Sequence, residues 1–170
     1  MRRILVFALL LSTMAIPTSL SAGKKPTPVD IKNFNKVFIG WVDVNPDDYH
    51  KLGYGSKQEW AGVINGANVN FQKELASSSA FAGKTVTSAK DRADANTEGN
   101  DLYVKFTDVE FDHKYRLHIA AHFIDLKSNS EIGSVPLETY GAHLCSLSGC
   151  LDKELAEVNK KIQELAGTGK

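Results

Sequence analysis

The stretch 99–137 constrains the fold more than any other part of this chain. It reads GNDLYVKFTDVEFDHKYRLHIAAHFIDLKSNSEIGSVPL, in which apolar and polar side chains alternate through runs rich in β-branched and aromatic residues. We interpret it as a meander of three antiparallel strands at 102–111, 115–126 and 131–137. One face of such a meander is apolar and must be covered, and amphipathic stretches before and after it can cover it.

The alternation also predicts how the first two strands pair. Pairing Phe111 with Arg116 places Val104 opposite Phe123 and gathers the apolar side chains on one face. A slip of one residue would bury two histidines without partners, at a cost of roughly 1–3 kcal/mol each. In the favoured register Asp108 and Glu110 fall on the apolar face near the hairpin tip, where we expect that face to open to water.

The opposite face of the meander is polar and is a candidate binding surface. It collects Lys105, Arg116, His118 and His122. Four residues along a strand span roughly 13 Å, so His118 and His122 cannot bind one metal ion together unless the strand is broken. Exposed histidines on a polar face are the favoured interpretation.

Two helices and two more strands are predicted around the meander. A capping pattern, Ser56 with Glu59, opens a helix whose apolar stripe contains Trp60, Ile64, Ala67, Phe71 and Leu75. A second helix is predicted at 151–166, with the stripe Leu151, Leu155, Val158, Ile162 and Leu165. The run 36–44 is apolar on both faces, which suits a strand near the centre of the sheet, and 84–88 can form a short strand. Pro136 cannot donate to a ladder, so the last strand of the meander should lie at an edge or end there. The predicted fold class is α+β: a mixed or antiparallel sheet of four to five strands, with two main helices packed on one face.

The first 22 residues are typical of a secretory signal peptide. Arg2 and Arg3 precede a short apolar run, and small residues allow cleavage after Ser21 or Ala22. An uncleaved anchor is the alternative, although the run is shorter than the roughly 20 apolar residues of a spanning helix. We then expect a flexible tether at 23–35, a single α+β domain at 36–166 and a disordered tail at 167–170. Without Arg2 and Arg3, the chain has eighteen basic and twenty acidic residues, a net charge of about −2. This charge does not indicate a basic surface that would bind nucleic acid.

Two glycines before the first predicted helix offer a possible ligand site. Backbone amides near Gly53, Gly55 and Ser56 could hold an anion at the helix N-terminus. Simple capping is the favoured interpretation, since the spacing of a nucleotide-binding loop is absent. The stretch 43–48 resembles the start of a calcium loop, but Asp48 stands where that loop needs glycine, so a turn after the strand is favoured.

Cys145 and Cys150 are the only cysteines, and in an oxidising compartment they predict a structural disulfide. The spacing differs from the redox Cys-x-x-Cys pattern, and a zinc site with His143 would still need a fourth ligand. No pattern of residues indicates a catalytic nucleophile or an acid/base pair, so neither an enzyme nor a cofactor is expected.

The order strand, helix, variable stretch, meander, helix resembles a known family when two short motifs are added. These are Asn100-Asp101 at the start of the meander and Phe123-Ile-Asp125-Leu-Lys-Ser-Asn129 at its second turn. Together they resemble small bacterial envelope proteins with the TolB amino-terminal-like fold, which include penicillin-binding-protein activator lipoproteins. The resemblance covers about 36–165. Unlike the lipoproteins, this chain has no cysteine at the cleavage site to carry a lipid.

The resemblance implies a secreted or periplasmic accessory protein that is not an enzyme and contacts an envelope protein complex. The alternative is a periplasmic protein that binds a small ligand, an anion or a metal ion.

Overall fold

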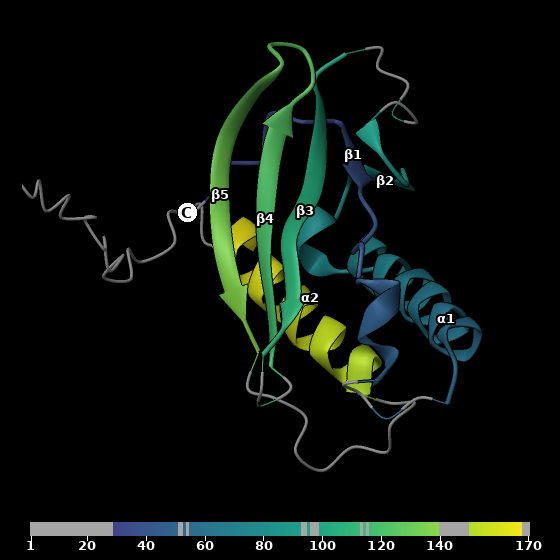
Figure 1. The fold of residues 1–170 in the computed structure, drawn as a ribbon. Helices are drawn as coiled ribbons and strands as arrows, with labels where there is room; N and C mark the ends of the chain where they lie inside the picture. The colour runs from purple at the N-terminus through teal and green to yellow at the C-terminus, as the bar shows by residue number, and fades with distance from the viewer. Residues whose placement is uncertain are drawn as a thin grey trace, which may run out of the picture.

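A five-stranded mixed sheet carries both long helices on one face, which confirms the predicted α+β class (Figure 1). The structure, a computed structural model, describes residues 29–50, 53, 55–92, 95, 99–112, 114, 116–139 and 150–167. The strands are β1 (Lys36–Ile39), β2 (Thr85–Ser88), β3 (Asp101–Phe111), β4 (Leu117–Asp125) and β5 (Ser130–Glu138). The helices are α1 (Lys57–Ala76) and α2 (Cys150–Gly167), with short 3₁₀ turns at Pro46–His50 and Ser79–Phe81.

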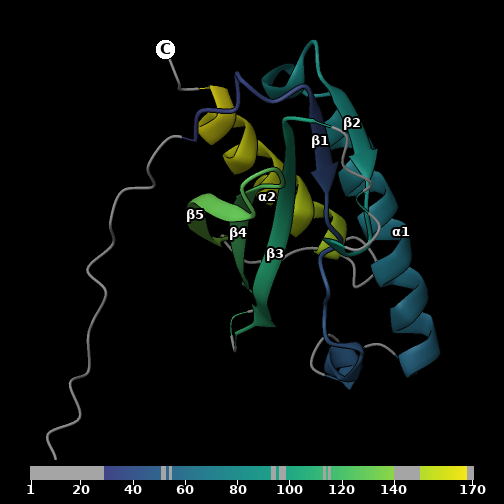
Figure 2. The same cartoon turned by 90° about the horizontal axis from the view of Figure 1, so that it is seen from above.

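The strand order is β2-β1-β3-β4-β5, with both helices behind the sheet (Figure 2). β1 lies inside the sheet, as expected, parallel to β2 on one side and to β3 on the other. β3, β4 and β5 form the predicted antiparallel meander, and β5 is its edge strand. The predicted turn between β4 and β5 is also present, with Asn129 in the left-handed conformation.

The register of β3 and β4 is as predicted over most of their length and wrong at the hairpin tip. Val104 pairs with Phe123, but Phe111 pairs with Leu117 rather than with Arg116. The cause is a β-bulge between Thr107 and Glu110, where Asp108 adopts a φ of 54°. The extra residue reverses the alternation, so Phe111 is buried while Asp108 and Glu110 are exposed.

The main core lies between the sheet and the two helices. Both predicted helical stripes face it, and in α1 the largest fully buried side chains are Trp60, Phe71 and Leu75. The Phe71 ring meets the Phe106 ring of β3 edge-on, with 5.5 Å between centroids. α2 buries all five residues of its stripe. The predicted apolar face of the meander is therefore the face that the helices cover.

The predicted tether is corrected in its second part. Residues 23–28 lie outside the described part of the chain, but Val29 and Ile31 are buried in the main core. A Cβ on Gly133 of β5 would come within 2.9 Å of Val29 Cγ2, so strand and segment are in close contact there. The packed domain therefore begins before Lys36, because both of these apolar side chains pack into the main core.

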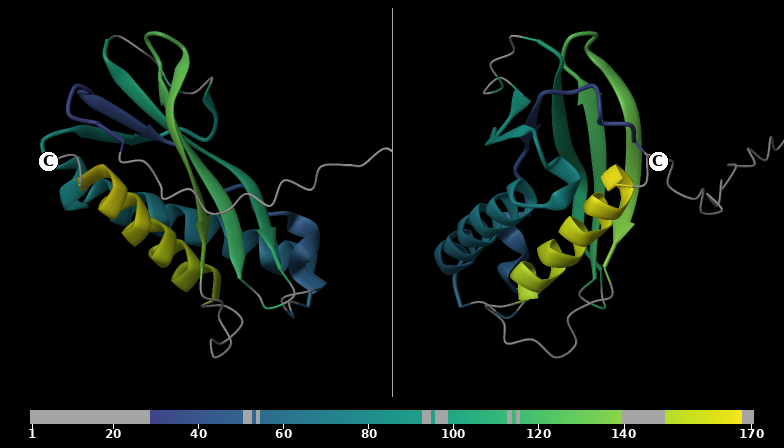
Figure 3. Two further views of the ribbon diagram at one scale, coloured as in Figure 1. Left: turned by 90° about the vertical axis from the view of Figure 1, so that its left-hand side faces the viewer. Right: turned by 180° about the vertical axis from the view of Figure 1, so that it is seen from behind.

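Within the described part of the chain, no helix covers the other face of the sheet (Figure 3). Near β1 it holds a small second cluster of buried side chains, Phe38, Ala89, Tyr103 and Leu126. Beyond that cluster, over β3, β4 and β5, the face carries charged and polar side chains, with Ala120 and Pro136 between them. Among the described residues no helix is long and apolar enough to span a membrane.

Candidate functional site

The polar side chains predicted to share one sheet face do so, but they fall into two groups. We call the polar face the surface formed by Lys105, Thr107, Asp112, Arg116, His118, His122, Glu131 and Glu138. Arg116 and His118 lie near the hairpin tip of β3 and β4, whereas His122 lies in mid-strand, opposite Lys105. The turn after β3 and the strand β5 supply acidic partners that the prediction did not name, which are Asp112, Glu131 and Glu138.

Asp112 organises the first group. Its carboxylate accepts hydrogen bonds from the backbone amides of Lys114 (2.8 Å) and Arg116 (3.0 Å) and from the Arg116 guanidinium (2.7 Å). His118 Nε2 lies 3.4 Å from the same carboxylate, and the guanidinium also pairs with Glu138 of β5. Desolvation by itself would raise the pKa of Asp112, but these donors together hold that pKa well below its ordinary value. The Arg116 pKa is raised in turn, chiefly by its hydrogen bond to Asp112.

His122 centres the second group. Its Nδ1 lies 2.9 Å from Glu131 Oε2, and its Nε2 lies 2.8 Å from Thr107 Oγ1. The hydrogen bond from His122 lowers the pKa of Glu131, with a smaller contribution from Ser134. Because both ring nitrogens have partners, the imidazole is held in one orientation on the sheet.

The two groups hold their donors and acceptors in fixed positions. Glu131, His122 and Thr107 place a carboxylate, an imidazole and a hydroxyl in line, an arrangement that also occurs in hydrolases. Thr107 also hydrogen-bonds to Asp108 Oδ2, at 3.2 Å. The polar face therefore offers oriented donors and acceptors of both charge signs.

The candidate anion site at the start of α1 has its amides occupied. The Gly53 amide donates to the His50 carbonyl (3.4 Å), and the Gly55 amide donates to Glu59 Oε2 (3.2 Å). Ser56 caps the helix by accepting from the Glu59 amide (3.1 Å). Capping, the favoured interpretation, is therefore present, and Glu59 places a negative charge where an anion would bind.

The predictions for metal and disulfide sites remain untested. Within the described ranges, no three His, Cys, Asp or Glu side chains gather as metal ligands. Cys145 and His143 lie outside the described residues, and Cys150 is described only as the first residue of α2.

A second feature, which the sequence did not reveal, is a pocket where β1 ends. The predicted strand 36–44 keeps its ladder only to Ile39, after which Gly40 donates a last bond to Val104. From there the chain is held by α1. The buried Asn68 accepts from the Val42 amide (2.8 Å) and donates to the Val42 carbonyl (3.0 Å). A polar residue inside an apolar helical stripe was the available signal for this contact.

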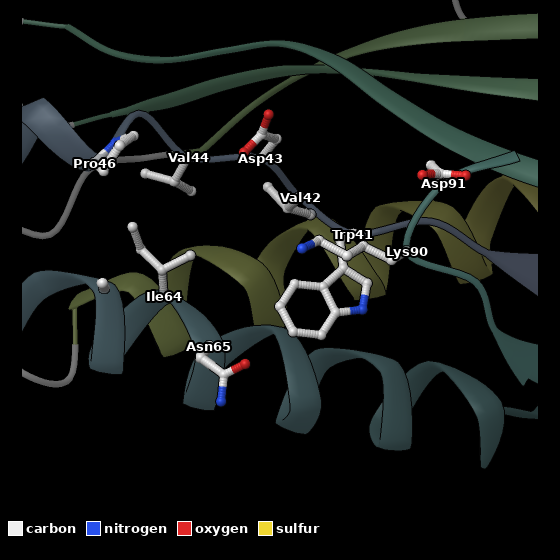
Figure 4. A pocket seen from close by; sticks show the side chains of 10 residues that line it. Trp41, Val42, Asp43, Val44, Pro46, Ile64, Asn65, Lys90 and Asp91 are labelled. Carbon is white, nitrogen blue, oxygen red and sulfur yellow. The ribbon is translucent and has the colours of Figure 1, made fainter. Parts of the chain in front are cut away.

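We call this feature the Trp41 pocket. It is an open cavity of about 530 Å³ between the segment that follows β1, α1 and the residues that follow β2. Figure 4 shows Trp41 between that segment and α1, with Lys90 beside its ring. Asp43 and Asp91 lie on the side of the pocket away from α1.

Comparisons with known proteins found only distant likenesses of fold. A scan against protein-family models gave no match, and no curated protein matched the sequence. Among solved structures, the chain is similar to a PelC dodecamer subunit from Paraburkholderia phytofirmans, at 13% identity and a TM-score of 0.44, over 78% of this chain and 91% of that one. It is also similar to a neuraminyllactose-binding hemagglutinin homolog from Helicobacter pylori, at 13% identity and a TM-score of 0.43, over 84% and 87% of the two chains. Protein XCC0632 from Xanthomonas campestris is a third, at 11% identity and a TM-score of 0.43, over 85% and 93%.

Likenesses at this level carry no argument about what this chain does. None of the three is a TolB-like protein or a penicillin-binding-protein activator. The family resemblance drawn from the sequence therefore stays a prediction.

Proposed function

We propose that this protein is a secreted, non-enzymatic accessory protein of the bacterial envelope that binds a protein partner through the polar face of its sheet. The observation that carries the proposal is the contrast between the two faces. One face is covered by α1 and α2. Among the residues that the structure describes, no helix covers the face over β3, β4 and β5, which displays charged groups fixed in place.

The fixed charged side chains favour binding, because they have little conformational freedom left to lose when a partner binds. The Arg116 side chain is 30% exposed and already held by Asp112 and Glu138, and His122 is held by Glu131 and Thr107. Groups held before binding reduce the entropy cost of forming an interface. They remain exposed enough to accept or donate further hydrogen bonds to a partner.

The mixture of signs favours a protein as the partner. Arg116 and Lys105 are interspersed with Asp112, Glu131 and Glu138, so no uniform positive field attracts nucleic acid or an anionic membrane. A protein surface with complementary charges would gain both specificity and association rate from such a pattern. The secreted location rests on the signal pattern at 1–22.

A pair of charge reversals tests the proposal. Lys105→Glu alters the polar face, and Lys73→Glu makes the same change on the exposed side of α1. Each tagged variant is expressed in the protein's own host, cross-linked in cells and purified, and captured proteins are quantified by mass spectrometry. We expect a reproducible envelope protein with wild type and Lys73→Glu, and recovery at least about fivefold lower with Lys105→Glu.

Equal recovery with both variants would show that the polar face is not the contact. If wild type captured no envelope protein, the accessory function itself would be wrong.

A further inference from the structure

The Trp41 pocket combines a flat aromatic surface with polar groups at its edge. Trp41 is partly exposed, whereas Val42 and Val44 on either side of Asp43 point into the main core. The hydrogen bonds from Asn68 to Val42 fix this alternation, because they hold the backbone of the segment against α1. The indole is therefore presented by a rigid support rather than by a free loop.

The place in the fold is one where ligands commonly bind. The pocket lies beyond the carboxyl end of β1, between the residues that follow two parallel strands, β1 and β2. Space beyond the carboxyl ends of parallel strands is a common place for ligands to bind.

The charges around Trp41 restrict the ligand. The Lys90 ammonium lies 5.8 Å from the centroid of the Trp41 ring and would repel a cation in the same place. Asp43 and Asp91 line the pocket as well and would repel an anion. A neutral ligand avoids both repulsions.

A neutral ligand must also satisfy the hydrogen-bonding groups that it covers. The carboxylates accept hydrogen bonds, the ammonium donates them, and the Asn65 amide of α1 does both. Hydroxyl groups can hydrogen-bond to the carboxylates, the ammonium and the amide, because each hydroxyl is both a donor and an acceptor. A pyranose ring carries hydroxyls around its rim and C–H bonds on its face, and those C–H bonds suit the electron-rich face of an indole.

We propose that the Trp41 pocket binds a neutral saccharide, with the sugar ring stacked on Trp41 and its hydroxyls bonded to Asp43, Asp91 and Lys90. Lys90 swings from the indole to the sugar rim as the ring stacks, which its flexible four-carbon stem allows. This site shares no residue with the polar face, so it is separate from the protein contact proposed above.

Tryptophan fluorescence tests the proposal directly. The second tryptophan, Trp60, is fully buried, so a change in emission on adding sugar reports on Trp41. The full chain, purified after secretion, is titrated with maltotriose, cellotriose and triacetylchitotriose, and with spermidine and trigalacturonate as charged comparators. At least one neutral trisaccharide should change the emission in a saturable way below about 5 mM, and the charged probes should not.

Substitutions locate the binding. Saturation-transfer NMR with the sugar that binds best should show affinity lower by about fivefold or more for Trp41→Ala, and also lower for Asp43→Asn. Asp152→Asn, an equivalent change on the exposed side of α2, should leave affinity unchanged. Because Trp41 and Asp43 are not in the main core, both variants should fold.

Three results would overturn the proposal. They are no saturable binding of any of the three trisaccharides, tighter binding of spermidine or trigalacturonate, and undiminished sugar binding by Trp41→Ala.

Discussion

At the scale of single residues, Asn68 replaces a missing strand partner. It is fully buried in α1, and its amide group pairs with both the N–H and the C=O of Val42. Without it the Val42 N–H would be buried without a partner, which is costly because water cannot replace the lost bond. The Val42 carbonyl would keep only the bond from the Val44 amide (3.1 Å). Asn68 therefore helps to hold the segment that carries Trp41.

We predict that Asn68→Leu, a change that keeps the volume but removes the amide, lowers the free energy of unfolding by about 2–4 kcal/mol. Urea denaturation followed by circular dichroism measures the change. Asn65→Leu, at an exposed position of the same helix, serves as the control and should cost less than about 0.5 kcal/mol. Equal losses for the two variants would mean that the Val42 bonds do not stabilise the fold.

The lowered pKa of Asp112 predicts that the stability of the fold decreases at acid pH. Its pKa in the folded protein is lowered, mainly by the amide and guanidinium of Arg116 working against desolvation, while in the unfolded chain it is near 3.9. As the pH is lowered, the Asp112 carboxylate therefore takes up its proton at a higher pH in the unfolded chain than in the folded protein. The contribution of Asp112 to the free energy of unfolding is fully present above about pH 4 and is lost as the pH falls further. We expect Asp112→Asn to melt at a lower temperature than wild type at pH 7, and the gap to narrow between about pH 4 and pH 2. A gap of constant size across that range would contradict the assigned network.

At the scale of elements, the segment 29–35 is the part of the fold whose packing could not be predicted from the sequence. Val29 and Ile31 stand among polar residues and a proline, so no periodicity marks them as core. The burial of Val29 depends on a tertiary contact, the space that Gly133 leaves in β5.

This contact predicts a coupled pair of substitutions. Gly133→Ala alone should lower the free energy of unfolding by about 1–3 kcal/mol, because its Cβ would meet Val29 Cγ2 at 2.9 Å. In a Val29→Ala background the same change should cost clearly less, since the obstructing methyl group is gone. Chemical denaturation of the four proteins in this double-mutant cycle gives the coupling. A cost for Gly133→Ala that is the same in both backgrounds would show that the segment does not pack there.

The β3 bulge marks a second limit of prediction at this scale. The pairing of Val104 with Phe123 could be predicted, because alternation along both strands allows only one register that buries the apolar side chains. The bulge at Asp108 has no comparable signal, since aspartate is common both in regular turns and at left-handed positions. The same shift places Asp112 opposite Arg116, so this contact could not be predicted either.

At the scale of the whole molecule, the layers and the shared face of Lys105, Arg116, His118 and His122 followed from the sequence, and the Trp41 pocket did not. Two helical stripes and a meander with one apolar face define an α+β fold in which both helices share a face. The Trp41 pocket arises where β1 leaves its ladder early, which depends on how short β2 is and on Asn68. Such features come from packing between distant segments, and local patterns do not encode them.

The predicted disulfide is a further test at this scale. If Cys145 and Cys150 are joined in the secreted protein, its intact mass under non-reducing conditions should be lower by two hydrogens than after reduction. Reduction should also lower the free energy of unfolding by at most about 2–3 kcal/mol, since the closed loop is short. An unchanged mass on reduction would mean that both thiols are free.

The most direct test of the central claim, that the polar face is the partner surface, is photo-cross-linking from defined positions in living cells. A photoreactive amino acid is placed at Lys105 on the polar face and, in a second strain, at Val69, which is exposed on α1. The account predicts that Lys105 becomes linked to one envelope protein, identified by mass spectrometry, and that Val69 does not. Cross-linking of that protein from Val69 but not from Lys105 would contradict it.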